Sequence, residues 1–302
     1  MQLGFVSAIL PEFTLEDLLT FAADEGFACV EVMCWPAGDA ERRYAGITHL
    51  DVTTLDDEKV GRIRDLVQQT GVAISGLGYY PNPLHPDPEH RRVVIHHLTQ
   101  VIQAAARLEV RLVNTFIGRD PNRSVEANWT LFQAVWPEIV QCAEMEGVNL
   151  AIENCPMLFS RDEWPGGKNL AVSPAVWQGL FQEIPSPHLG LNFDPSHLVW
   201  LFIDYVRCIR DFSNRIFHVH AKDTRIDPDA LYAMGILGLG WHTAKLPGLG
   251  DVKWGPFFAA LTDAGYRGPV CIEVEDRAFE GSLDDRKRAL RQSKRFLEQF
   301  VS

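Results

Sequence analysis

Short β-rich runs alternate with amphipathic helical patterns along nearly the whole chain, and this alternation limits the folds that it can adopt. The β-rich runs lie at residues 3–6, 29–33, 72–77, 110–116, 149–153, 189–194, 216–220 and 270–273. The helical patterns between them include residues 14–25, 57–69, 90–108, 125–146 and 254–264. Strands that alternate with helices form right-handed βαβ units and hence a parallel sheet. Eight such units without a break in composition predict an α/β fold, a single (β/α)8 TIM barrel over residues 1–302.

The joints between these elements differ in length on the two sides of the predicted barrel. Helices end on glycine directly before the next strand at Gly26, Gly71, Gly147 and Gly265. Glycine adopts the left-handed conformation of a helix C-terminus without steric cost. The strand-to-helix joints are much longer, at residues 34–56, 78–89, 154–173 and 221–253. Long loops on one side of a barrel usually shape or cover a binding site.

Two of the long joints have the composition of lids. Residues 154–173 and 221–253 are rich in Gly and Pro, and they carry Trp164, Tyr232, Trp241 and His242. We expect these long βα loops to act as lids over the mouth of the barrel. The alternative architecture, two α/β subdomains on an open sheet, agrees less well with the unbroken alternation.

The composition excludes several classes of protein. The formal charge of −12 opposes nucleic-acid binding, which relies on clustered lysine and arginine. No apolar run approaches the ~18 residues of a membrane span, and the N-terminal segment lacks a secretory signal. The six cysteines form no CxxC pair, which favours thiols in a reducing cytoplasm. No GxGxxG, GxxxxGKS or GxSxG motif supports nucleotide binding or serine hydrolysis. We therefore expect a cytoplasmic protein without a nucleic-acid or membrane partner.

Four of the apolar runs end on side chains that bind divalent cations. They are Glu153, Asp194, His220 and Glu273, each at the carboxyl end of a predicted strand. A parallel barrel brings these ends together at one mouth. Alone, each has a simpler explanation, because a strand-end carboxylate usually caps a helix, as Asp194 would, and a strand histidine is usually a core residue. Together, three buried carboxylates would cost several kcal/mol without a cation. The sequence therefore predicts one bound divalent metal ion.

The ligand types narrow the identity of that ion. Three oxygen donors and one nitrogen, with no thiolate, suit a fairly hard cation in five- or six-coordinate geometry. Mn²⁺ is the first choice, followed by Mg²⁺ or Co²⁺. Zn²⁺ is also consistent, because the affinity order favours it over most of these ions.

Residues next to the predicted ligands are candidates for substrate binding. His197 lies one helical turn past Asp194, where it could reach a substrate hydroxyl or a second metal. Lys222 and Arg225 follow His220 and offer positive charge to an enolate oxygen or a carboxylate.

A second group of candidates lies on the first four predicted strands. Glu31 and Trp35 flank strand two, and Tyr79 and Asn114 stand at the tops of strands three and four. For Trp35 and Tyr79, packing under a loop is as good an explanation as stacking on a sugar. His218 shares a strand face with the ligand histidine but lies one layer deeper, so we expect a hydrogen-bonded core residue.

Five motifs in the second half of the chain resemble those of a known family. They are Ala-Ile-Glu-Asn at 151–154, Asn-Phe-Asp-Pro-Ser-His at 192–197, His-Val-His-Ala-Lys-Asp at 218–223, Pro-Gly-Leu-Gly-Asp-Val-Lys-Trp at 247–254 and Cys-Ile-Glu at 271–273. The set resembles the xylose-isomerase-like TIM barrels, also called the sugar phosphate isomerase/epimerase or AP endonuclease 2 superfamily. The first half of the chain matches mainly in architecture.

The resemblance implies a cation held by Glu153, Asp194, His220 and Glu273. In the ketose epimerases of this family the two ligand glutamates also move protons, while the equivalent of His197 and an arginine contact substrate oxygens. Arg225 lies near the position of that arginine, at a different spacing from the ligand histidine. The AP endonucleases of the superfamily need a zinc cluster with further histidines, which strands three and four of this chain do not supply.

A narrower resemblance joins the chain to the larger, metal-bearing subunits of bacterial C-glycoside deglycosidases. It rests on residues 193–200, 219–224 and the Glu-Val-Glu-Asp-Arg-Ala-Phe-Glu segment at 273–280. Those enzymes act on 3-keto glycosides and work with a smaller partner. The resemblance therefore implies a small-molecule sugar or keto-glycoside substrate, and either a homo-oligomer or a hetero-oligomer with a smaller subunit.

Three functions follow, of which the first is a metal-dependent sugar isomerase or epimerase. In it Glu153 and Glu273 remove and return a proton next to a carbonyl, His197 assists, and the cation stabilises the enediolate. The alternative is a lyase or deglycosidase that cleaves C- or O-glycosides by β-elimination, with His197, Lys222 or a lid residue protonating the leaving group. The third is a non-catalytic sugar-binding barrel, which has no reason to keep four complete ligands.

Overall fold

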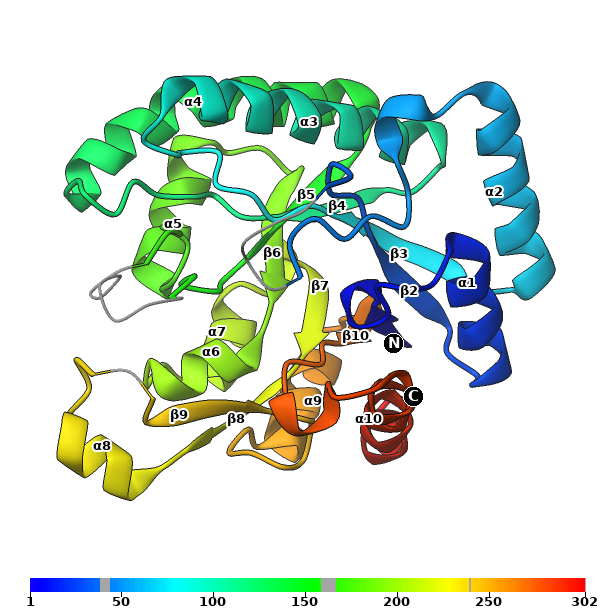
Figure 1. Cartoon of the computed structure of the whole chain (residues 1–302). Coiled ribbons are helices and arrows are strands. Elements are labelled where there is room, and N and C mark those ends of the chain that lie inside the picture. Colours follow the sequence, from blue (N-terminus) through cyan, green and yellow to red (C-terminus); the bar gives the residue numbers. More distant parts are fainter. Residues whose placement is uncertain (39–43, 159–166, 239, 302) are drawn as a thin grey trace.

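Eight parallel strands close into a barrel in this computed structural model, which describes residues 1–38, 44–158, 167–238 and 240–301. Their order around the barrel is β1-β10-β7-β6-β5-β4-β3-β2 (Figure 1). The strands are β1 (Gln2–Val6), β2 (Cys29–Met33), β3 (Ala73–Gly78), β4 (Leu112–Thr115), β5 (Asn149–Glu153), β6 (Leu189–Phe193), β7 (Ile216–Ala221) and β10 (Pro269–Ile272). The first and last strands pair from Gln2 opposite Pro269, which completes the barrel. The predicted (β/α)8 fold is confirmed.

Helices surround this barrel, and each lies between two of its strands along the chain or follows the last one (Figure 1). They are α1 (Leu15–Asp24), α2 (Asp57–Thr70), α3 (Pro88–Arg107), α4 (Val125–Glu146), α5 (Pro174–Glu183), α6 (Pro195–Trp200), α7 (Tyr205–Asp211), α9 (Trp254–Asp263) and α10 (Leu283–Leu297). Short 3-10 helices cover Ser7–Ile9, Val52–Thr54, Ser213–Arg215 and Arg277–Phe279. None of the helices in the described part of the chain combines the length and apolar character needed to cross a membrane.

Local sequence signals explain where many of these helices begin and end. Thr14 begins α1 with a capping box, in which its side chain accepts the Asp17 N–H and the Asp17 carboxylate accepts the Thr14 N–H. Gly71 and Gly147 end α2 and α4 with φ values of 68° and 65°, as their positions before the next strand predicted. The helix-to-strand joints are therefore short, and the longer chain segments lie at the opposite end of the barrel.

The predicted lid at residues 221–253 contains regular structure of its own. An antiparallel ribbon of β8 (Asp223–Ile226) and β9 (His242–Lys245) leaves the barrel after β7 and carries α8 (Pro228–Met234) between its strands (Figure 1). Two aromatic residues expected to cover the mouth differ in environment, since Tyr232 on α8 is 94% exposed whereas Trp241 is buried. Trp164, in the other predicted lid, lies outside the described residues. A lid role for both segments stays a prediction.

The apolar core lies between the barrel and its helices. Its largest fully buried side chains include Trp136, Trp177, Phe132, Phe193 and Phe257. The inside of the barrel is different, because polar side chains of β2, β6 and β7 are fully buried there. Burial of polar groups is costly unless they are hydrogen-bonded or bind a ligand. The polar interior therefore marks the part of the barrel that serves a function.

Candidate metal centre

The four predicted ligands meet at the mouth of the barrel. Glu153 ends β5, Asp194 follows β6, His220 lies near the end of β7, and Glu273 follows β10. One ligand atom from each lies within 4.8 Å of the corresponding atom of every other. His220 Nδ1 stands 3.6 Å from Glu153 Oε1 and 3.5 Å from Glu273 Oε2. Three of the four residues are buried, and the side chain of Glu273 is 19% exposed.

Asp194 caps a helix and also contributes to the centre. Its Oδ1 accepts the backbone N–H of Ser196 at 2.8 Å, which begins α6. The side chain of Asn154 fixes the backbone of this residue, because its Oδ1 accepts the Asp194 N–H at 2.8 Å and its Nδ2 donates to the Asp194 carbonyl at 2.9 Å. The other carboxylate oxygen, Oδ2, remains turned toward the ligand group.

Atoms without hydrogen bonds show that these residues fit a divalent cation. Within the described structure, Asp194 Oδ2 and His220 Nδ1 are buried and make no hydrogen bond. Buried polar atoms rarely lack a hydrogen bond. Here the oxygen has ion-pair contacts alone, at 3.2 Å from Lys222 Nζ and from His197 Nε2, and it converges with the imidazole nitrogen and two further carboxylates in the arrangement that a cation requires. Carboxylate oxygens and one imidazole nitrogen are donors that Mn²⁺, Mg²⁺, Co²⁺ and Zn²⁺ accept.

Lys222 places a permanent positive charge beside the same carboxylates. Its Nζ lies 2.6 Å from Glu273 Oε2, 3.0 Å from Glu275 Oε2 and 3.2 Å from Asp194 Oδ2. Burial alone would lower the pKa of Lys222, but the carboxylates of Glu273 and Glu275 raise that pKa well above its usual value. A divalent ion bound here would share Glu273 and Asp194 with this ammonium group.

The two glutamate ligands are ionised at neutral pH for related reasons. Burial alone would raise the pKa of Glu273, but the charges of Lys222 and His220 outweigh it and lower this pKa to about 2. Burial acts in the same direction on Glu153, where the close imidazole rings of His197 and His220 outweigh it and lower the pKa far below its usual value. Both carboxylates can therefore bind a cation or accept a proton.

His197 reaches the centre from the first turn of α6. Its Nε2 lies 3.2 Å from Asp194 Oδ2 and 3.5 Å from Glu153 Oε1. Apart from these two ion-pair contacts, both ring nitrogens are buried without a hydrogen bond among the described residues, so Nδ1 in particular can serve a substrate. The thiol of Cys155 stands close enough to join His197 and Glu153 as a group of three potential ligands.

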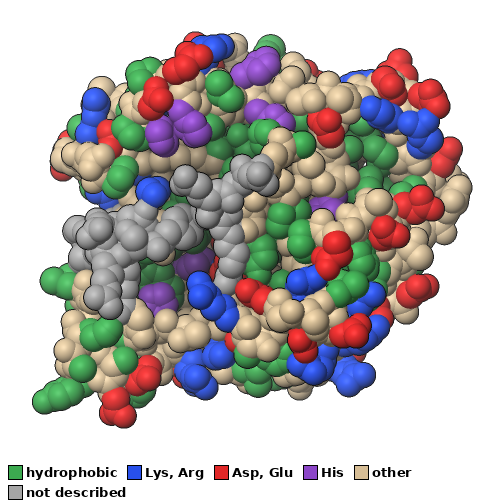
Figure 2. Space-filling view, in the orientation of Figure 1, with side chains coloured by type: hydrophobic (Ala, Val, Ile, Leu, Met, Phe, Trp, Pro, Cys, Tyr) green, Lys and Arg blue, Asp and Glu red, His purple; other side chains and the backbone are tan. Residues whose placement is uncertain are grey.

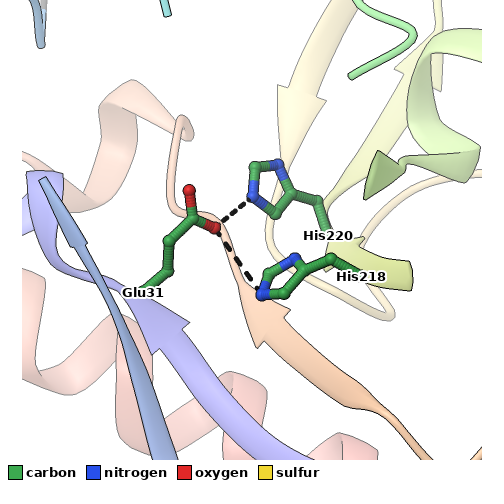
Figure 3. A group of neighbouring side chains, drawn as sticks. All are labelled: Glu31, His218 and His220. Carbon is green, nitrogen blue, oxygen red and sulfur yellow. Dashed lines mark hydrogen bonds and ion pairs between the residues drawn. The ribbon is translucent and has the colours of Figure 1, made fainter. Parts of the chain in front are cut away.

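On the other side of His220 lies Glu31, which the sequence offered as a second-group candidate without indicating its partner. The Glu31 carboxylate on β2 contacts His220 Nε2 at 2.7 Å, so the ring connects Glu31 to the metal centre (Figure 3). Neighbouring His218 donates from Nδ1 to Asn192 Oδ1 at 3.0 Å and is fully buried, as expected for a hydrogen-bonded core residue. Burial lowers the pKa of His218 to about 4. The signal in the sequence was a glutamate within an otherwise apolar strand. Nothing in the sequence indicated that its partner lies 189 residues away.

The remaining predicted substrate-binding residues are more scattered. Trp35 lines a small cavity above the centre. Tyr79 is buried, with its ring 5.0 Å from that of Trp35 and 4.7 Å from that of His97. These contacts favour packing under a loop over stacking on a sugar for Tyr79. Asn114 is fully buried in β4, and neither of its amide atoms has a hydrogen bond in the described structure. Arg225 is exposed on β8 and contributes to neither of the two cavities at the mouth.

Two cavities open beside the metal centre. The smaller, of about 80 Å³, has a mostly apolar wall and includes Glu153 and Glu273. The larger, of about 800 Å³, lies under the β8–β9 ribbon and includes His197. Cys155, Lys222 and Glu275 line both cavities. In Figure 2 histidine side chains are visible deep in a hollow, with lysine or arginine and acidic side chains at its edge.

Comparison with known proteins agrees with this geometry. Residues 19–300 match the family described as the xylose isomerase-like TIM barrel. The chain belongs to this family. The resemblance inferred from the five sequence motifs is thereby confirmed, and the proteins similar to this chain include dehydratases in sequence and epimerases in fold.

Two curated relatives and one solved structure illustrate the range of the family. The uncharacterized protein YfiH of Bacillus subtilis (strain 168) is 26% identical over 97% of this chain and 99% of its own length. The inosose dehydratase of Geobacillus thermodenitrificans (strain NG80-2) is 32% identical over 32% of this chain and 34% of its own. The D-psicose 3-epimerase of Clostridium cellulolyticum H10 superposes with a TM-score of 0.70 at 16% identity, covering 100% of both chains. That last likeness concerns the fold alone.

Proposed function

We propose that the protein is a divalent-metal-dependent isomerase or epimerase that moves a proton next to the carbonyl of a small polyhydroxylated substrate. One observation supports this proposal above all, the convergence of the four predicted ligands at the mouth of the barrel. Two of their buried ligand atoms, Asp194 Oδ2 and His220 Nδ1, make no hydrogen bond among the described residues. A divalent cation held by these residues, with Mn²⁺ as the first choice, would polarise the carbonyl and ease loss of the neighbouring proton.

The side chains around the centre suit the remaining steps of such a reaction. Glu153 ends β5 and Glu273 follows β10, and β6 and β7 separate these strands in the barrel, so the two glutamates approach the centre from different sides. One glutamate takes the proton from the carbon, and the other returns a proton to the same or the adjoining carbon. His197 and Lys222 lie beside them and would hold the substrate oxygens in place.

A second candidate is elimination, in which the same first step is followed by loss of a group from the β-carbon. The larger cavity favours it, because about 800 Å³ exceeds the needs of a free monosaccharide. The inosose dehydratase relative favours it as well. Lys222 lines both cavities and could protonate the departing oxygen, whether the substrate loses water or is a keto-glycoside that loses its aglycone.

Solvent deuterium distinguishes these possibilities. Protein stripped of metal and reloaded with Mn²⁺ or Co²⁺ is incubated in D2O with D-psicose, D-tagatose or inosose, and the products are followed by proton NMR. An isomerase or epimerase incorporates deuterium into a product of unchanged composition, whereas elimination yields a dehydrated product. Glu153→Gln and Glu273→Gln should each abolish either outcome.

Failure to exchange or to eliminate in the metal-loaded protein, with any of these probes and with keto-glycosides, would contradict both candidates. The expected assembly, a homo-oligomer or a hetero-oligomer with a smaller subunit, stays a prediction that sedimentation analysis of the purified chain can test.

A further inference from the structure

A buried carboxylate that the proposed chemistry does not use lies inside the barrel. Glu31 on β2 is fully buried and stands across the barrel interior from β7. Its Oε2 lies 2.7 Å from His220 Nε2, and Figure 3 shows the carboxylate turned toward this ring. An ionised carboxylate in such a place is unfavourable unless partners compensate for its lost hydration. Its contact with a predicted metal ligand suggests what it does there.

A carboxylate at this distance determines which nitrogen of the ring carries the hydrogen. Asn192 Nδ2, a donor, lies 3.0 Å from His220 Nε2, but the Glu31 carboxylate is closer, at 2.7 Å, and an ionised carboxylate accepts hydrogen bonds and cannot donate them. The closer contact therefore places the hydrogen on His220 Nε2, while Asn192 Nδ2 donates to Tyr80. The lone pair then resides on Nδ1, the atom that faces Glu153 Oε1 and Glu273 Oε2. A metal ion requires such a lone pair, and histidine ligands are commonly oriented by a carboxylate on their second nitrogen.

Neighbouring residues hold Glu31 in this orientation. The Tyr80 hydroxyl donates to Oε1 of Glu31, so both carboxylate oxygens are engaged. Asn192 Nδ2 in turn donates to the Tyr80 hydroxyl at 3.1 Å. Gly78 on the adjacent strand β3 leaves the necessary room, because a Cβ atom at this position would lie 2.7 Å from Glu31 Oε1.

The same group could instead be a second, deeper metal site formed by Glu31, His218 and His220. Two ligands of one ion at bond lengths of about 2.1 Å stand about 3 Å or more apart. The 2.7 Å between Glu31 Oε2 and His220 Nε2 is shorter and suits a charge-assisted hydrogen bond. His218 Nε2 is 3.8 Å from the carboxylate and lies 3.2 Å from the Ser75 hydroxyl instead. The geometry therefore favours an orienting contact.

We propose that Glu31 is a positioning residue that fixes the Nε2–H tautomer of His220 and thereby presents Nδ1 to the divalent cation. This inference rests on the proposed function, because it concerns the same metal centre. It assigns to a residue of the first half of the chain a role that the four ligands alone do not provide. Removal of such a partner typically weakens metal binding by ~10- to 100-fold.

Metal affinity in a graded series of variants tests the inference. Zn²⁺ and Mn²⁺ dissociation constants are measured by chelator competition for the wild type, Glu31→Gln and Glu31→Ala. Alanine should weaken binding by ~10- to 100-fold. Glutamine should weaken it less, because its amide oxygen still accepts from Nε2. Ser75→Ala is the matched control, since Ser75 faces the same barrel interior but contacts His218 rather than His220, and it should leave the affinity unchanged.

A spectroscopic measurement separates positioning from general damage to the fold. In Zn²⁺-loaded protein with ¹⁵N-labelled histidine, the wild type and Glu31→Gln should show a hydrogen on Nε2 of His220 and the shift of a metal-bound nitrogen at Nδ1. If Glu31→Ala does not fold, the Glu31→Gln affinity and these spectra still decide the question.

The possible failures are distinguishable. Equal affinity in all three proteins, or a hydrogen on His220 Nδ1 in the wild type, would overturn the inference while leaving the metal centre in place. A wild type that binds the ion tightly but exchanges no proton would overturn the proposed function alone. A wild type that binds neither Zn²⁺ nor Mn²⁺ would overturn both.

Discussion

We expect Asp194 to serve two purposes, because its two oxygens face different parts of the molecule. Oδ1 accepts the Ser196 N–H at the start of α6, while Oδ2 is buried in the metal centre without a hydrogen bond in the described structure. Helix capping and metal binding were alternative explanations of this residue in the sequence, and the geometry accommodates both. A substitution that preserves one purpose and removes the other can therefore separate them.

Asp194→Asn is that substitution. Asparagine caps helices as well as aspartate does, so the free energy of unfolding of the metal-free protein should change by less than about 1 kcal/mol. Divalent-ion affinity should fall by ~10-fold or more, because a charged ligand is lost. Urea unfolding with and without metal measures both effects. A large loss of stability in the metal-free protein would show that the carboxylate matters mainly to the fold.

Lys222 and a bound metal ion would share carboxylates, so the effect of Lys222→Met on stability should depend on whether metal is bound. Without the ammonium group, buried carboxylates lose their partner, and the metal-free protein should lose about 3 kcal/mol of stability. The metal-loaded protein should lose much less, because the ion replaces the missing charge. Calorimetric melting with and without Mn²⁺ measures this. Lys245→Met removes an ion pair with Asp276 in the same cavity, and it is the control that metal should not rescue.

At the scale of elements, the β8–β9 ribbon is attached to the barrel by specific contacts. Asp223, at the start of β8, accepts the N–H groups of Gly248 at 3.0 Å and Val252 at 3.0 Å. It also accepts the indole N–H of Trp254 at 2.9 Å, which fixes the return of the chain to α9. At the other strand, the ring of His242 stacks on that of Trp200 with centroids 4.4 Å apart. These contacts hold the ribbon over the larger cavity.

The His242 contact predicts how the stability of the protein depends on pH. Burial, aided by the charge of His197, lowers the pKa of His242 to about 4. The unfolded chain binds this proton near pH ~6.5, so the stabilising contribution is complete above that pH and is lost as the pH falls toward 4. Because the ring is partly exposed, we expect a loss of about 1 to 2 kcal/mol.

Urea unfolding between pH 7.5 and pH 4 checks this expectation. His242→Gln should be less stable than the wild type at pH 7.5 and should show a smaller decrease on acidification. Parallel pH profiles for the two proteins would rule out His242 as the titrating group.

At the scale of the whole molecule, barrel closure brings together ligands that are 120 residues apart in the sequence, from Glu153 to Glu273. An ion held by the ends of β5, β6, β7 and β10 binds the folded chain and not the unfolded one. At a metal concentration 100 times the dissociation constant, this difference adds about 2.7 kcal/mol to the free energy of unfolding.

Thermal melting measures this linkage directly. Mn²⁺ should raise the melting temperature in proportion to the logarithm of its concentration, and EDTA should reverse the effect. Glu273→Gln should flatten the dependence. An equal response to Mn²⁺ in the wild type and in Glu273→Gln would place the ion elsewhere.

Much of this architecture was predictable because it depends on periodic signals. Alternating apolar runs and helical patterns specify a barrel, and Gly71 and Gly147 mark the helix ends at which the chain turns back. The convergence of Glu153 and His220 followed from topology alone, since parallel strands place their carboxyl ends at one mouth. Hydrophobic patterns, helix-ending glycines and the common direction of the strands in a parallel barrel were sufficient to predict these features.

Other parts of the site depend on distances that no local pattern encodes. Glu31 meets His220 only because the barrel has a particular diameter and register, and the sequence offered no more than a charged residue in a buried strand. Arg225 was placed near substrate by its closeness to His220 in the chain, yet the ribbon carries it to an exposed position. Closeness in sequence is a poor guide where the chain leaves the barrel in a hairpin.

The two cavities at the mouth differ in size, about 80 Å³ against about 800 Å³, and Cys155, Lys222 and Glu275 line both of them. A substrate that reaches into both would have its smaller end in the small cavity and its larger end in the large one, so we expect it to bind in one orientation. A substrate held in one orientation presents one face of its reacting carbon to each glutamate. The unequal volumes of the two cavities would thus determine the stereochemistry of proton transfer as well as which substrates can bind.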